Sequence, residues 1–131
     1  VGVMVEVNCE TDFVARSEAF REFAHEMALQ IAAVSPRWVQ EQDIPEDVLA
    51  YEAEIVRKRF LDEGKPEHIL DRIVEGAMNK FKDDVCLLRQ PYIRDDDISI
   101  QDFLHQTIAA IGENIVIRRF VRWEVGDNTT S

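Results

Sequence analysis

A small apolar residue occupies every odd position among the first nine, and this pattern constrains the fold more than any other feature of the chain. The period of two is that of a half-buried β-strand, with Val1, Val3, Val5, Val7 and Cys9 on its covered face. Such a strand needs a pairing partner and a layer of side chains over its apolar face. The rest of the chain must therefore supply both.

Residues 115–125 are the best candidate partner, because they are rich in β-branched and aromatic residues. If the period of two holds throughout, one face of this segment carries Ile115, Ile117, Val121, Trp123 and Val125. The other face then carries Val116, Arg118, Phe120 and Arg122. A weaker pattern at residues 37–41 predicts a short third strand.

Between these segments, apolar residues recur every three or four positions, which is typical of amphipathic helices. A first helix is expected to begin after Ser17, and a last one to begin at a Ser99–Asp102 capping pair. The short break at residues 64–66 separates two more helices and favours an antiparallel pair. The predicted fold is α+β, a small three-stranded antiparallel sheet packed with about four helices. We expect one core domain at residues 1–126 and a disordered tail at 127–131.

The charge of the chain limits its partners. Its 131 residues include 26 acidic and 15 basic side chains, for a formal net charge of -11. A surface this negative repels phosphate backbones and anionic lipids, so neither nucleic acid nor a membrane is expected as a partner. No apolar run approaches the roughly 20 residues of a membrane span. The two cysteines, Cys9 and Cys86, form no CxxC motif and are expected to be reduced thiols.

The sequence offers little for catalysis, and we expect no enzyme activity, no cofactor and no metal. The three histidines fall in different predicted helices, and no glycine-rich phosphate loop or nucleophile motif is present. The run Asp95–Asp97 could be interpreted as a metal site. It lacks the alternating spacing and the glycine of a calcium loop, so a solvated loop is the better interpretation.

The junction between the first strand and the first helix stands out, because Thr11, Asp12 and Phe13 place an aromatic ring beside a carboxylate. In one interpretation, Phe13 folds back as a staple onto the helix and Asp12 caps it. In the other, Phe13 is presented to a partner, since aromatic anchors dominate protein interfaces. The spacing alone leaves both interpretations open.

Four longer segments of the sequence resemble those of a known protein family. The run EVNCETDFVAR at residues 6–16 closely resembles the signature of translation elongation factor Ts. EGKPEHILDRIVEG (63–76), CLLRQPYIRDD (86–96) and GENIVIRRFVRWEVG (112–126) resemble the same family in the same order. The chain begins at Val1 inside the expected strand, so we expect a fragment that lacks the N-terminal helical module of the family. It resembles the short form with a single core unit.

The resemblance implies a guanine nucleotide exchange factor for elongation factor Tu, a GTPase, with no active site of its own. Asp12 and Phe13 would push into the GTPase beside its magnesium site, with Thr11, Val14 and Arg16 as further partner-binding residues. The protein would act in the bacterial cytoplasm or in an organelle stroma or matrix. The alternative is an acidic interaction module that kept the fold without the exchange role.

The resemblance also implies self-association, because short forms of this family dimerise by packing their sheets together. An uncovered apolar sheet face is rare on soluble monomers, and a homodimer would cover it. We therefore expect a homodimer with Met4, Val116 and Phe120 at or near the interface. The alternative is that an N-terminal segment or a long loop covers this face.

Overall fold

The computed structural model describes residues 1–127, and the expected disordered tail lies almost entirely outside them. Within these residues, β1 (Gly2–Asn8) and β4 (Val116–Trp123) form one antiparallel pair. The hairpin of β2 (Pro91–Tyr92) and β3 (Asp95–Ser99) forms a second. The α+β class is confirmed, but the single three-stranded sheet is wrong, because the described residues form two separate two-stranded sheets.

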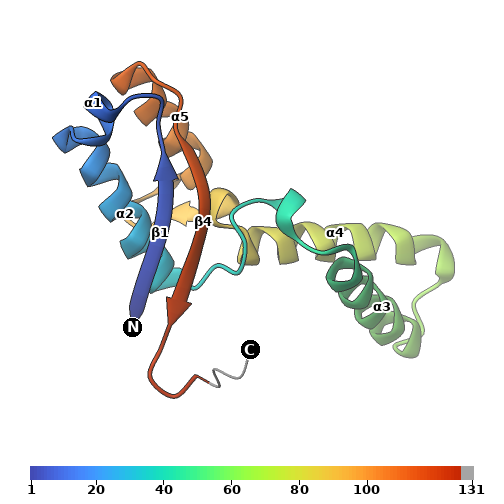
Figure 1. Cartoon of the computed structure of the whole chain (residues 1–131). Helices are drawn as coiled ribbons and strands as arrows, with labels where there is room; N and C mark the ends of the chain where they lie inside the picture. The colour runs from blue at the N-terminus through green and yellow to red at the C-terminus, as the bar shows by residue number, and fades with distance from the viewer. Residues whose placement is uncertain (128–131) are drawn as a thin grey trace.

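The helices form two groups (Figure 1). The short helix α1 (Asp12–Ala15), α2 (Glu18–Val34) and α5 (Ile100–Ile111) lie with the β1–β4 sheet, and α2 packs against β1. The pair α3 (Glu46–Asp62) and α4 (Glu67–Val85) projects away from this core as an arm, confirming the predicted antiparallel pair. The described residues therefore contain five α-helices, one more than the approximate number expected.

The ends of the helices follow local chemistry. Ser17 caps α2, because its hydroxyl accepts a hydrogen bond from the Phe20 amide. Ser99 and Asp102 form the predicted capping box at α5, which ends at Gly112 in the left-handed conformation with φ 85°. These boundaries agree with the sequence because each depends on residues only three or four positions apart.

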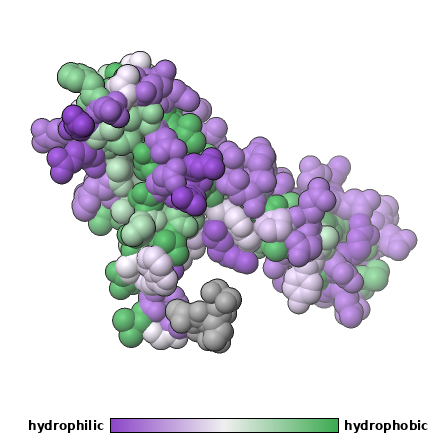
Figure 2. All heavy atoms as spheres, in the orientation of Figure 1, coloured by the Kyte–Doolittle hydropathy of each residue, from purple (hydrophilic) through white to green (hydrophobic). Residues whose placement is uncertain are grey.

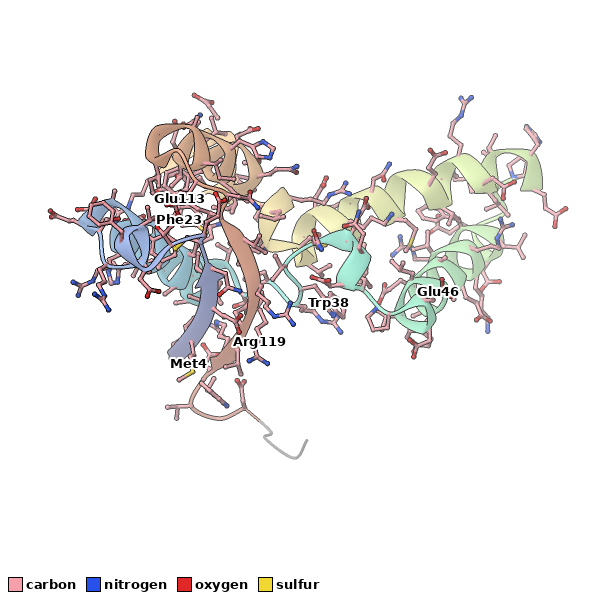
Figure 3. All side chains as sticks on the ribbon, turned by 45° about the horizontal axis from the view of Figure 1, so that its top comes forward. Met4, Phe23, Trp38, Glu46, Glu113 and Arg119 are labelled. Atoms are coloured by element: carbon pink, nitrogen blue, oxygen red, sulfur yellow. The ribbon has the colours of Figure 1, made fainter. Side chains whose placement is uncertain are left out.

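The segment expected as a third strand joins the arm to the core instead. Trp38 makes an isolated parallel bridge with Cys86, and the chain then enters a short 3-10 helix, η1 (Glu41–Asp43). The backbone groups of residues 37–39 bond to Val85, Leu87 and Leu88, which lie around the end of α4 and in the 3-10 helix η2 (Leu87–Arg89). Trp38 accordingly lies where the arm meets the core (Figure 3). These bonds occupy the segment and leave it unavailable to the sheet.

The main core lies between the β1–β4 sheet and the helices α2 and α5. Its buried members include Phe23, Met27, Ile31, Ile100 and Ile117. Val3, Val5, Val7 and Cys9 pack against it, which confirms four of the five residues predicted for the covered face of the first strand. Val1 is 64% exposed, because it precedes β1 and lies beyond the last pair of the sheet. A smaller cluster of Ile44, Val85 and Cys86 lies at the base of the arm.

The faces predicted for the last strand are wrong beyond Ile117, because the strand contains a β-bulge. Val7 pairs with Ile117 and Glu6 with Arg119, so Arg118 has no opposite residue. One extra residue inverts the alternation. Phe120 therefore packs against the core, and Val121 and Trp123 lie on the exposed face.

The inversion also explains the arginines of β4. Arg122 lies on the covered side, where its Nη2 donates to the Ala32 carbonyl near the end of α2 at 3.0 Å. Arg119 and Arg118 form ion pairs with Glu6, with N–O distances of 2.8 and 3.6 Å. The hydrogen bond from Asn8, followed by that from Arg119, lowers the pKa of Glu6.

Candidate functional site

The junction after β1 forms a single turn of helix, α1, with a cap at each end. The Thr11 hydroxyl accepts a hydrogen bond from the Val14 amide at 3.2 Å, so Thr11 is the N-cap. At the far end, the Ser17 hydroxyl donates to the Val14 carbonyl at 2.7 Å. The interpretation of Asp12 as a helix cap is therefore wrong, and Asp12 is exposed in the first turn of α1.

Phe13 projects from this turn into water and is 86% exposed. The staple interpretation is wrong, because a staple would bury the ring against α2. The next residue does the anchoring instead, since Val14 is 8% exposed and belongs to the main core cluster. The turn thus presents the ring to solvent while its neighbour holds the backbone.

The five residues expected to contact a partner occupy this one turn and its edges, but they do not all face the same way. Thr11, Asp12, Phe13 and Arg16 are exposed. Val14 faces the core, so its role in the free protein is to anchor the turn. The exposed set places one carboxylate, one guanidinium and one phenyl ring on a small protruding surface.

Glu113 holds this turn from the other end of the chain and was missed by reasoning from the sequence. Its Oε2 accepts a hydrogen bond from the Thr11 hydroxyl at 2.6 Å, and its Oε1 accepts from the Glu10 and Thr11 amides, both at 3.1 Å. Glu113 precedes β4 and lies at the end of the sheet that carries α1 (Figures 1 and 3). The only sequence signal was its place in the GENIVIRRF run, which does not indicate a contact 102 residues away.

A groove between α2 and α5 begins beside the turn, with Arg16 on its rim. Tyr92 stacks on Phe103 in its floor, with ring centroids 4.4 Å apart. The Tyr92 hydroxyl donates to Glu26 at 2.8 Å, and the hydrogen bond from Arg94 lowers the pKa of Glu26. Burial, and then this bond to Glu26, raises the pKa of Tyr92 to about 12.

The three aspartates at residues 95–97 lie in β3, not in the expected loop. Their carboxylate oxygens lie within 4.8 Å of one another, and all three residues are exposed. The Asp95 carboxylate accepts a hydrogen bond from the Asp97 amide at 3.2 Å. Exposed acidic groups of this kind are common without a metal, so the cluster does not indicate a metal centre.

The outer face of the β1–β4 sheet carries exposed apolar side chains on either side of the ion pairs that Glu6 makes with Arg118 and Arg119, and Figure 2 shows hydrophobic and hydrophilic groups side by side there. Met4 is 69% exposed, and Val116 and Trp123 are each 49% exposed. Met4 and Val116, two of the three residues expected at a dimer interface, are therefore exposed on this face. The third, Phe120, is on the covered face for the reason given above.

Among residues 1–127, none of the helices combines the length and the hydrophobicity needed to cross a bilayer.

The family model described as Elongation factor TS matches residues 1–107. Proteins named Elongation factor Ts are also similar over 127 residues, or 97% of this chain. Those of Moorella thermoacetica, Coprothermobacter proteolyticus and Geobacter metallireducens are 52%, 54% and 52% identical, and the match covers 63%, 64% and 59% of their lengths. The chain therefore spans less than two thirds of the length of these relatives.

Proposed function

Since the chain belongs to the elongation factor Ts family, we propose that it is a guanine nucleotide exchange factor for elongation factor Tu, acting in translation elongation. In this proposal it carries out no chemical step. It binds the GDP-bound GTPase through α1 and promotes GDP release, in the bacterial cytoplasm or an organelle.

One observation carries the proposal, namely that Phe13 is 86% exposed on a turn fixed at both ends. An exposed phenyl ring gains about 1.5 to 3 kcal/mol when a partner buries it. That free energy can offset the cost of displacing side chains in the GTPase. Asp12 lies beside the ring and is exposed, so it would enter the same region.

The proposed mechanism weakens the magnesium site of the partner. Mg²⁺ demands near-ideal octahedral geometry and usually bridges protein groups and phosphates. If Asp12 and Phe13 displace the groups around the ion, the GTPase therefore binds both Mg²⁺ and GDP more weakly. By linkage, the factor and GDP lower each other's affinity for the GTPase by the same factor.

A stopped-flow measurement of fluorescent GDP release from elongation factor Tu tests the proposal. The chain is expected to accelerate release, and the acceleration should shrink as free Mg²⁺ is removed. If the chain binds the GTPase without accelerating release, it is an acidic interaction module that kept the fold only.

We also propose that the protein forms a symmetric homodimer through the outer face of the β1–β4 sheet, as the resemblance implies. Met4 and Val116 stay in the proposed interface, and Val121 and Trp123 take the place of Phe120, because the β-bulge turns Phe120 inward. Large apolar side chains gathered on one sheet face are rarely left uncovered on soluble monomers.

A further inference from the structure

The β1–β4 pairing ends three residues before α1 begins. Its last pair is Asn8 with Val116, and residues 9–11 and 112–115, which adjoin this end of the sheet, belong to neither strand. Hydrogen bonds nevertheless join these two connections, residues 9–11 after β1 and residues 112–115 before β4. Two carboxylates make these ties in place of backbone pairing.

The first tie is Glu113, whose side chain accepts three hydrogen bonds from Glu10 and Thr11. The second is reciprocal, because Oε2 of Glu10 accepts a hydrogen bond from the Asn114 amide at 2.7 Å. Hydrogen bonds to an ionised carboxylate are shorter and about twice as strong as bonds between neutral groups. The pair therefore continues the sheet with side chains where the backbone no longer pairs.

The turn needs this support, because α1 is only four residues long. A single helical turn is not stable by itself, since nucleation fixes several residues for one hydrogen bond. The Thr11 hydroxyl both caps α1 and donates to Glu113. It therefore links the helical turn to the clamp, by which we mean the hydrogen bonds that the Glu113 carboxylate accepts from Glu10 and Thr11. A loss of Glu113 leaves the first turn held only by Val14 and the caps.

We propose that Glu113 is a positioning residue for nucleotide exchange. It fixes the backbone of Thr11, so that α1 keeps its conformation when Phe13 binds the partner. This inference rests on the proposed function. A preorganised aromatic loses little conformational entropy on binding, and a flexible one loses more. Glu113 acts only through the turn and makes no contact with the partner in this proposal.

A double-mutant cycle on the full chain tests the proposal, with release of fluorescent GDP from elongation factor Tu as the readout. Glu113→Ala is expected to slow the stimulated release about tenfold, or about 1.4 kcal/mol, in the chain that carries Phe13. In the Phe13→Ala background the same change is expected to slow release less than about twofold, because no ring remains to position. Equal effects in both backgrounds would overturn the proposal.

Conservative variants separate positioning from a loss of fold. The amide oxygen of Glu113→Gln can still accept the two backbone hydrogen bonds, so this variant is expected to lose no more than about threefold. Glu113→Asp is one methylene shorter and is expected to resemble alanine. The matched control is Glu75→Ala, which removes an exposed carboxylate from the arm and should leave release unchanged. If Gln and Ala are equally impaired while both remain folded, the clamp is not what supports exchange.

Amide hydrogen exchange of Glu10 and Thr11 provides an independent readout. Both amides are expected to lose protection in Glu113→Ala. Retained protection would show that the Glu113 carboxylate does not hold the Glu10 and Thr11 amides, and would overturn the proposal. If Glu113→Ala does not fold, Thr11→Val is used in the same cycle, because it removes only the hydroxyl. Failure of the proposed function would give a different result from failure of this inference. In that case elongation factor Tu would release GDP as fast with Phe13→Ala as with the unchanged chain.

Discussion

Replacing Phe13 by Ala should separate stability from function, because the ring is 86% exposed in the free protein. Full burial of a Phe side chain stabilises by about 1.5 to 3 kcal/mol, so the covered part of this ring contributes only about 0.2 to 0.4 kcal/mol to folding. The remainder, about 1.3 to 2.6 kcal/mol, is gained only when a partner covers the ring. Its loss should slow stimulated GDP release about 10- to 80-fold.

Two measurements on the same sample test this expectation. Thermal unfolding followed by circular dichroism should show a melting temperature lowered by no more than about 2 °C. Stopped-flow release of fluorescent GDP from elongation factor Tu should show the large loss. Phe23→Leu is the matched control, because Phe23 is 2% exposed and belongs to the core. That variant should melt several degrees lower and retain exchange per folded molecule.

The opposite pattern would refute the reasoning. If Phe13→Ala melts more than about 4 °C lower and exchanges normally per folded molecule, the ring is a structural element. Its exposure in the free protein would then have no functional meaning.

Three further outcomes are expected. Asp12→Asn should reduce stimulated GDP release, and less so at low free Mg²⁺; an equal loss at all Mg²⁺ concentrations, measured by stopped flow, would argue against a role at the metal. In sedimentation equilibrium at micromolar concentrations the chain should be a dimer and Trp123→Glu a folded monomer, whereas an unchanged chain that sediments as a monomer would exclude the dimer. Because the pKa of Tyr92 is raised to about 12, its contribution to stability is complete below the unfolded value of 10.0 and is lost as pH rises through about 12. Urea unfolding at about pH 9 and about pH 11.5 should show this loss, and Tyr92→Phe should lack it; an equal loss in both proteins would assign it to other groups.

The sequence predicted where the candidate site lies along the chain, but not whether the Phe13 side chain is buried or exposed. The order Thr11, Asp12, Phe13 located the turn, because a cap, a short helix and the start of α2 are local features. Whether Phe13 packs back or projects depends on which neighbour fits the core. Val14 takes that place, and an isolated turn of helix cannot bury both residues on the same side.

Local patterns were sufficient for the amphipathic helices, their caps and the covered face of β1, since each depends on residues within about one turn or one pleat. The faces of β4 beyond Ile117 were not predictable, because the strand carries apolar residues on both faces and its period cannot show a bulge. Pairing with β1 places that bulge at Arg118 and turns Phe120 inward. The bond between Glu113 and Thr11 likewise depends on two distant connections meeting at the end of the sheet. Such contacts form only when the chain closes on itself, so no local pattern encodes them.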